Sequence, residues 1–121
     1  MKIDFIADTN FLIYIHEGNL NTRPFLKYNF GISFISEIEL LGYAGISISE
    51  EIKLKSIIQN CFQTNWNNLM IDQTIQLKRN YQIKLPDAII AATSIANKVP
   101  LVSADKGFSR IKELDLVLLK I

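Results

Sequence analysis

The feature that most constrains this fold is the repeated alternation of short β-branched or aromatic runs with longer amphipathic stretches. The runs that predict strands are residues 3–7, 31–35, 69–71, 101–102 and 116–119. Strands that alternate with helices are typical of βαβ units and a parallel sheet. Such strands are covered on both faces and therefore read as nearly continuous apolar runs. We predict an α/β chain with a central, mostly parallel sheet of four to five strands.

The stretches between these runs have capping residues and apolar spacing that predict helices. The predicted helices are residues 11–16, a helix that starts at Thr22 and Pro24, one capped by Ser36 that extends through Ala44, one that opens at Ser47 or Ser49 with an apolar face reaching Phe62, one capped by Asp72, and one that starts at Pro86. The helix that starts at Pro86 is apolar nearly all round, so we expect it to be buried.

The size and charge of the chain limit what it can be. Its 121 residues suit a single domain spanning residues 1–121. It has 13 Lys and Arg against 12 Asp and Glu, which is not the basic surplus of a protein that binds nucleic acid by charge alone. A nucleic-acid contact would therefore be local or assisted by a metal ion.

Cysteine use and hydropathy indicate the compartment. The chain has one cysteine, Cys61, which fits a reducing environment. Asp4 and Asp8 interrupt what would have to be the apolar core of a signal peptide. The longest apolar runs reach about five residues, whereas a membrane-spanning helix needs about 20. We expect a cytoplasmic protein with no membrane segment.

Acidic residues follow the predicted strands. Asp8 comes directly after the first strand, and Asp105 follows the fourth. Glu39 lies in the helix after the second strand, and Asp87 begins the apolar helix that leads into the fourth. In open α/β sheets, ligands bind beyond the carboxyl ends of the strands. All four acids can therefore face one end of the sheet.

Each acid also has a purely structural explanation. Asp8 and Asp87 stand at helix starts, where a carboxylate caps free amides and meets the positive end of the helix dipole. Asp105 lies in an ordinary turn sequence. Taken singly, capping or turn formation explains each of these three better than catalysis does, so the functional hypothesis depends on the four acids acting together.

Glu39 competes with its neighbour Glu37. Positions 37 and 39 of a helix project roughly 200° apart, so only one of them can face inward. Glu39 is flanked by the apolar residues Ile38, Leu40 and Leu41. We therefore predict that Glu39 is the partly sheltered carboxylate.

Carboxylates gathered at one site repel each other, so their pKa values rise or the site binds a cation. Oxygen ligands favour Mg²⁺ or Mn²⁺, and Zn²⁺ is disfavoured because His16 and Cys61 lie in different segments. A metal ion bound by carboxylates lowers the pKa of a water molecule and offsets charge on a phosphodiester oxygen. The sequence contains no glycine-rich loop of the phosphate-binding type.

Four segments of the chain, in order, resemble the motifs of PIN domains. They are Asp8-Thr9-Asn10, residues 36–42 (SEIELLG), residues 85–92 (LPDAIIAA) and residues 101–108 (LVSADKGF). The resemblance covers residues 3–110, and the length of the chain is similar to that of the VapC toxins of bacterial type II toxin–antitoxin pairs. It implies a three-layer α/β/α fold and a Mg²⁺- or Mn²⁺-dependent endoribonuclease. It further implies an RNA substrate, a homodimer and an inhibiting antitoxin from an adjacent gene.

The resemblance also implies roles for individual residues. The acidic quartet that would bind metal is Asp8, Glu39, Asp87 and Asp105. Asn10 and Ser103 would orient those carboxylates through hydrogen bonds, and Lys84, Lys106 and Arg110 are candidate contacts for RNA phosphates.

The chain departs from the PIN pattern at two positions. Ser103 stands where Thr is usual, which keeps the hydroxyl. Gly107 stands before Phe108, where an acidic residue is common. In this segment the acidic group therefore depends on Asp105 alone, so one metal ion has more of the expected ligands than a second one would.

Three alternatives remain open. A PIN nuclease could work in RNA processing outside any toxin pair. Gly107 motivates a non-catalytic PIN-like module that binds RNA or protein. A receiver-like phosphoacceptor domain would need paired acids after the first strand, where this chain has only Asp8, and an acceptor Asp where Asp72 is better explained as a cap.

Overall fold

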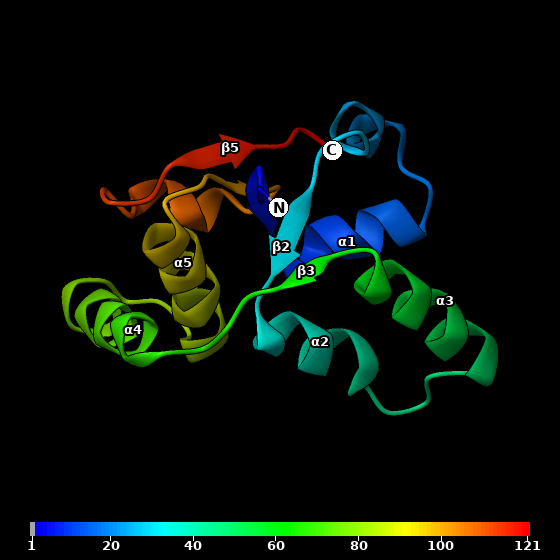
Figure 1. Ribbon diagram of the computed structural model, residues 1–121, viewed down its shortest axis with the longest axis horizontal. Coiled ribbons are helices and arrows are strands. Elements are labelled where there is room, and N and C mark those ends of the chain that lie inside the picture. The colour runs from blue at the N-terminus through cyan, green and yellow to red at the C-terminus, as the bar shows by residue number, and fades with distance from the viewer. Residues whose placement is uncertain (1) are drawn as a thin grey trace.

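The computed structural model describes residues 2–121, which form a five-stranded parallel sheet between two groups of helices (Figure 1). The strands are β1 (Phe5–Ala7), β2 (Phe30–Ile32), β3 (Phe62–Gln63), β4 (Leu101–Ser103) and β5 (Leu116–Leu118), in the spatial order β3-β2-β1-β4-β5. Strand β1 lies at the centre, where Ile6 pairs with Gly31 on one side and Leu101 on the other. All neighbours are parallel, so the strands end at one edge.

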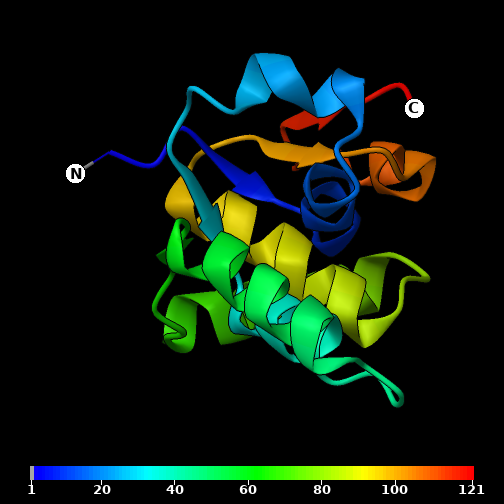
Figure 2. The same ribbon diagram turned by 90° about the vertical axis from the view of Figure 1, so that its right-hand side faces the viewer.

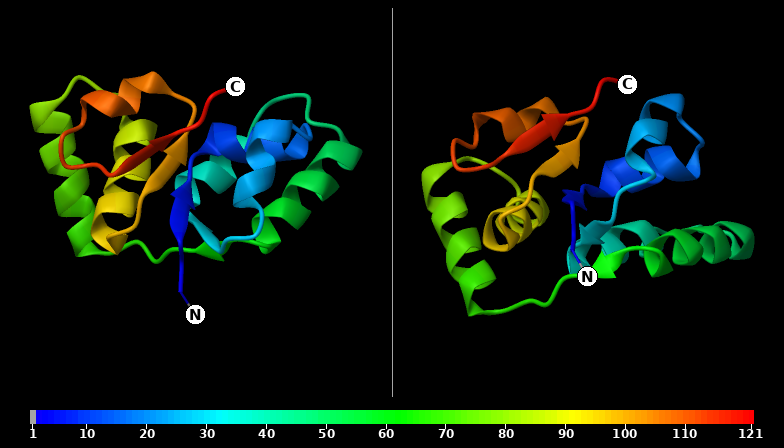
Figure 3. Two further views of the ribbon diagram at one scale, coloured as in Figure 1. Left: turned by 90° about the horizontal axis from the view of Figure 1, so that it is seen from above. Right: turned by 45° about the horizontal axis from the view of Figure 1, so that its top comes forward.

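Helices and two short 3-10 helices connect the strands. They are α1 (Thr9–His16), η1 (Leu20–Phe25), α2 (Phe34–Leu41), α3 (Ile48–Gln59), α4 (Asn68–Asn80), α5 (Leu85–Asn97) and η2 (Lys106–Arg110). Figure 3 shows α4 and α5 on one side of β1, and α1, α2 and α3 on the other. In the described part of the chain, no helix has the length and apolar character needed to cross a membrane.

The sheet separates two apolar cores, because successive strand residues point to opposite faces. Ile6 of β1 packs with the buried helix α5, as the nearly continuous apolar character of that helix predicts. Phe5 and Ala7 face the other core, which contains Phe11 of α1 and a cluster of edge-to-face aromatic rings. Figure 2 shows β1 and β4 between η1 and α5. With both faces covered, the edge at which the strands end is the part of the sheet open to a ligand.

The predicted third strand is wrong. Residues 69–71 belong to α4, and the third strand is β3, at Phe62–Gln63. Helix α4 begins after Asn67, whose side chain accepts a hydrogen bond from the Met70 amide, so Asp72 lies inside the helix and does not cap it. Phe62, which was predicted to end the apolar face of the preceding helix, is a residue of β3, and that helix ends at Gln59.

The second predicted strand is too long at its carboxyl end. Ser33 caps α2 by accepting a hydrogen bond from the Ile35 amide, so residues 34 and 35 are helical although their side chains favour strands. Ser36 is therefore a buried residue inside the helix, and α2 ends at Leu41, with Gly42 as its C-cap, before Ala44.

The predicted start at Thr22 is also wrong. Asn19 caps η1, and Thr22 lies inside that helix, with its buried hydroxyl donating to the Asn19 carbonyl. The starts at Ser47 and Pro86 agree with the structure, because Ser47 caps α3 and Pro86 lies in the first turn of α5.

Candidate active site

Asp8 lies where the central strand ends, 4% exposed. It precedes α1 but makes no capping hydrogen bond to that helix. Its Oδ2 instead accepts a hydrogen bond of 2.6 Å from the Ser103 hydroxyl at the end of β4. Strands β1 and β4 are parallel neighbours, which is why two residues so distant in sequence meet.

The surroundings of Asp8 favour its protonated form. Burial raises the pKa of Asp8 from its ordinary value of 3.8 to about 6. The hydrogen bond from Ser103 and the nearby Thr9 amide lower the pKa in opposition to this rise, and the charges of Asp87 and Asp105 add to it. Ionisation of Asp8 therefore costs free energy in the folded protein, and a bound cation would offset this cost.

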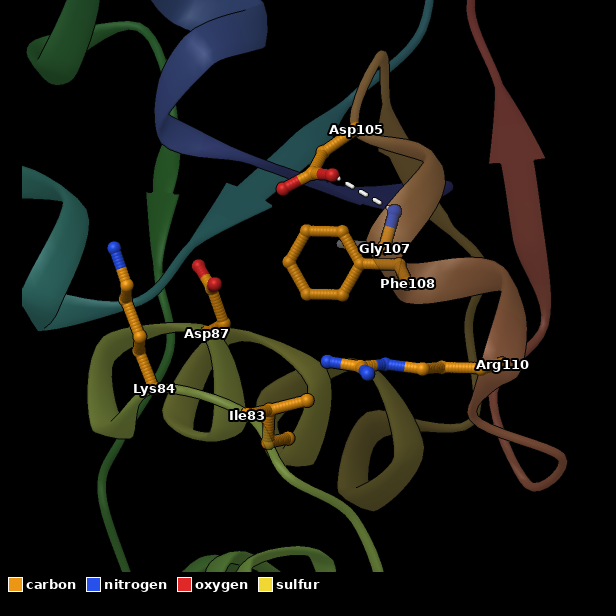
Figure 4. Close-up of a pocket in the computed structure, with 7 residues that line it drawn as sticks. All are labelled: Ile83, Lys84, Asp87, Asp105, Gly107, Phe108 and Arg110. Carbon is orange, nitrogen blue, oxygen red and sulfur yellow. Dashed lines mark hydrogen bonds between the residues drawn. The ribbon is translucent and has the colours of Figure 1, made fainter.

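Ser103 connects Asp8 to the segment that carries Asp105. The Ser103 Oγ also accepts a hydrogen bond of 3.0 Å from the Asp105 amide. The Asp105 carboxylate in turn caps η2, because its Oδ1 accepts a 2.8 Å hydrogen bond from the Gly107 amide (Figure 4). One buried hydroxyl thus fixes both the carboxylate of Asp8 and the backbone of Asp105.

Asp87 and Asp105 line the same cavity. It has a volume of about 280 Å³ and is lined by Ile83, Lys84, Asp87, Asp105, Gly107, Phe108 and Arg110. In Figure 4 the Asp87 carboxylate points from the first turn of α5 toward the cavity that Asp105 lines from above. The pKa of Asp87 is raised, first by partial burial and then by the charges of Asp105 and Glu39, while Lys84 opposes the rise.

Glu39 approaches the site from α2. Its Oε1 accepts a hydrogen bond of 2.7 Å from the Thr9 hydroxyl, and its charge raises the pKa of Asp87. Glu37 lies elsewhere and accepts a hydrogen bond of 2.8 Å from Gln63 at the β3 edge. The expected shelter of Glu39 is wrong, because its side chain is exposed and the neighbouring Ile38 is 57% exposed.

The expected orienting residues behave differently from one another. Ser103 makes the hydrogen bond to Asp8 that such a role requires. Asn10 is exposed, and no hydrogen bond of its side chain is found among residues 2–121. Thr9, which the sequence analysis did not single out, contacts a carboxylate instead. A hydroxyl residue at the first helical position after Asp8 was the available signal.

Two of the three candidate phosphate contacts lie at the cavity. Lys84 and Arg110 line it, whereas Lys106 begins η2 outside it. Arg110 also donates a hydrogen bond to the Gln82 carbonyl, so one of its nitrogens is already engaged. Within the described chain, the one ion pair joins Lys55 to Glu51, so the four acids lack a basic partner.

The chemistry of these donors fits Mg²⁺ or Mn²⁺, since all are carboxylate oxygens without a compensating cation. The four carboxylates do not form a complete metal-binding site in this structure. Among residues 2–121, no three His, Cys, Asp or Glu side chains lie close enough to hold a metal ion between them. The charges of Asp87 and Asp105 nevertheless raise the pKa of Asp8, and those of Asp105 and Glu39 raise the pKa of Asp87.

The sequence and the fold of this chain are similar to those of known proteins. Residues 5–114 match the family model of the PIN domain. The fold is similar to that of a toxin–antitoxin complex from Klebsiella pneumoniae, at 26% identity and a TM-score of 0.79, over 93% of this chain and 95% of that one. No curated protein sequence gives a significant match.

Two further solved structures show the same fold. One is VapBC2 from Rickettsia felis bound to a promoter DNA fragment, at 20% identity and a TM-score of 0.80, over 95% of this chain and 98% of that one. The other is DNA-bound VapBC from Salmonella typhimurium, at 20% identity and a TM-score of 0.81, over 96% of this chain and 98% of that one. These similarities confirm the predicted α/β/α fold with its parallel central sheet.

Proposed function

Because this chain belongs to the PIN domain family, we propose that it is a metal-dependent endoribonuclease and the toxin of a type II toxin–antitoxin pair. The observation that carries the proposal is the group of acids at the carboxyl edge of the sheet. The pKa values of Asp8 and Asp87 are both raised, in part by the charge of Asp105, and none of the four acids forms an ion pair with a basic side chain within the described chain. Such a group favours a divalent cation.

In this proposal Asp8 and Asp87 are the principal metal ligands, and Glu39 and Asp105 complete the shell directly or through water. A bound Mg²⁺ or Mn²⁺ would lower the pKa of a water molecule and offset charge on the phosphodiester. The protein's own contribution is to fix Asp8 through Ser103 and to supply positive charge beside the acids. Lys84 and Arg110, which line the cavity with Asp87 and Asp105, would contact RNA phosphates.

The cleavage test compares wild type with Asp8→Asn and Asp87→Asn, using single-stranded RNA with Mg²⁺, with Mn²⁺ and with a chelator. Wild type should cleave only with metal, and each substitution should slow cleavage by about 100-fold or more, a loss of about 3 kcal/mol of transition-state stabilisation. Asp72→Asn is the matched control, because Asp72 is an exposed aspartate of α4 outside the site. Equal cleavage by wild type and Asp8→Asn would refute the nuclease proposal.

The solved relatives include toxin–antitoxin complexes, which supports an antitoxin as partner, and we propose a bacterial RNA as the target. We also propose a homodimer in the cytoplasm. Expression of the wild-type chain should arrest bacterial growth, while Asp8→Asn should not. Co-expression of the product of an adjacent short gene should restore growth and co-purify with the chain. Growth arrest by Asp8→Asn to the same extent would contradict toxicity through cleavage.

A second candidate is a PIN-like module that binds RNA without cleaving it. Gly107 favours it, because no acid follows Asp105 at the position where the resemblance places one. The distance between the acids also favours a binding module, because among residues 2–121 no three such side chains lie close enough to hold a metal ion. RNA binding by fluorescence anisotropy together with Mn²⁺ binding by calorimetry, without cleavage of any RNA tested, would support the module over the nuclease.

A further inference from the structure

The hydrogen bond between Thr9 and Glu39 joins two helices at the candidate site. Thr9 is the first residue of α1 and directly follows Asp8. Its Oγ1 lies 2.7 Å from Glu39 Oε1 on α2. One short backbone segment therefore carries both a candidate metal ligand and the hydroxyl that contacts a second one. This pairing exists because α1, which begins at Thr9, packs against α2.

Ser36 completes this contact. Ser36 and Glu39 lie three residues apart on α2 and thus project from the same face. The Ser36 Oγ lies 2.9 Å from the Thr9 oxygen, and Ser36 is fully buried. A threonine hydroxyl carries one proton, and the Glu39 carboxylate can only accept it, so the Ser36 hydroxyl supplies the proton of the other contact. The direction of the Thr9 hydroxyl is thereby fixed.

Thr9 is well suited to restrain Glu39. It is only 8% exposed, whereas the Glu39 side chain is exposed and would otherwise sample several rotamers. A β-branched residue is stiff at its first side-chain torsion, so its hydroxyl stays where the backbone places it. Glu37, the neighbouring glutamate on α2, has no such partner at the site and contacts Gln63.

We propose that Thr9 is a positioning residue for Glu39: its hydroxyl fixes one carboxylate oxygen and leaves the second free to bind a cation beside Asp87. The part of this inference that concerns the cation rests on the proposed function. The contact itself does not, because it can be measured in the metal-free protein.

The first experiment measures the ¹³Cδ chemical shift of Glu39 by NMR in the metal-free protein, for Thr9→Val, Thr9→Ser and wild type. Valine replaces the hydroxyl with a methyl group of similar size, and serine keeps the hydroxyl. The Glu39 signal should move in Thr9→Val and return in Thr9→Ser, while the Glu37 signal stays unchanged. Thr74→Val is the matched control, since Thr74 is 7% exposed and donates to the Met70 carbonyl within α4.

The second experiment measures Mn²⁺ affinity by calorimetry. Thr9→Val should weaken binding about 10-fold, Thr9→Ser should restore it, and Thr74→Val should leave it unchanged. If Thr9 acts through Glu39, the double variant Thr9→Val/Glu39→Ala should bind no more weakly than Glu39→Ala alone. Additive losses, or Mn²⁺ binding by Thr9→Val equal to that of Thr74→Val, would overturn the proposal.

The outcomes separate the two proposals. If wild type binds no Mn²⁺ and cleaves no RNA, the proposed function fails, and the NMR experiment still decides whether Thr9 positions Glu39. If Thr9→Val does not fold, Thr9→Ala provides the same test, because it also removes the hydroxyl that donates to Glu39. A Glu39 signal unchanged in the folded variant would refute the positioning role whatever the protein cleaves.

Discussion

The two halves of the acidic site differ in how firmly the fold fixes them. Asp8 is 4% exposed, follows the central strand and is hydrogen-bonded by Ser103 of the adjacent strand. Asp87 and Asp105 line an open cavity, and the hydrogen bond of the Asp105 carboxylate is to Gly107 in its own turn. The buried half is pre-organised at a cost in desolvation, whereas the open half can adjust to what binds in the cavity.

The largest expected effect is on the free energy of unfolding, when Asn replaces the buried Asp8. Because its pKa is raised from 3.8 to about 6, the folded state keeps a proton that the unfolded state releases. This contribution to stability is fully present below pH 3.8 and is lost as the pH rises through about 6. In metal-free Asp8→Asn the loss should be absent, so at pH 7 the variant should be more stable than wild type by roughly 3 kcal/mol.

Urea unfolding between pH 3.5 and 7.5, with a chelator present, measures this difference. Mn²⁺ should stabilise wild type at pH 7 more than it stabilises Asp8→Asn, because a cation binds the ionised carboxylate. Equal pH profiles for wild type and Asp8→Asn would break the comparison, since Asp8 would then be no more costly to ionise than an exposed acid.

Ser103→Ala should have the next largest effect, because it removes a partner from both halves at once. The buried Asp8 carboxylate loses a donor, and the Asp105 amide loses an acceptor. The variant should lose about 1–3 kcal/mol of stability and about 10-fold or more in Mn²⁺ affinity. Ser109→Ala, which removes a hydroxyl bonded to the exposed Lys106 carbonyl, should change stability by less than about 0.5 kcal/mol. Similar losses in both variants would mean that Ser103 does not connect the halves.

Asp105 allows charge to be separated from capping. Asp105→Asn keeps a side-chain oxygen for the Gly107 amide, so stability should remain near that of wild type while Mn²⁺ affinity falls about 10-fold. Asp105→Ala loses the cap as well and should cost about 1 kcal/mol more in stability. Thermal melting and calorimetry on the two variants separate these effects. A larger loss of metal affinity in Asp105→Asn than in Asp8→Asn would reverse the comparison between the halves.

The same contrast explains what could be predicted from the sequence. The fold class and the edge on which the acids gather follow from apolar runs and from where parallel strands end, whereas the central position of the first strand was not predicted. The third strand could not be predicted, because its pair of residues is too short to give a periodic signal. Ser33 shows how a capping hydrogen bond converts two strand-like residues into the start of α2.

Side-chain partners were harder to predict than positions. The Ser103–Asp8 bond agrees with the geometry that the resemblance implies, because both residues end adjacent strands. Thr9 was missed because the hydroxyl at the start of α1 does not reveal its partner, which depends on how close α2 lies to the start of α1. Glu39 was preferred over Glu37 for its apolar neighbours, yet what distinguishes the two is the partner each contacts across the fold.

Substitution of Gly107 should have the smallest effect on stability and Mn²⁺ affinity, and it tests the half of the site that contains Asp87 and Asp105. A Cβ at this position would lie 3.1 Å from Asp105 Oδ1, so the carboxylate would have to shift by a few tenths of an ångström. Gly107→Ala should therefore cost less than about 1 kcal/mol of stability and weaken Mn²⁺ binding only a few-fold. Gly107→Asp adds the same Cβ and also the acid that the PIN resemblance places here, so calorimetry should show that it binds Mn²⁺ more tightly than Gly107→Ala. If the two variants bind alike, a missing carboxylate does not limit metal binding on this side, and the adjustable geometry of Asp87 and Asp105 would be the limit instead.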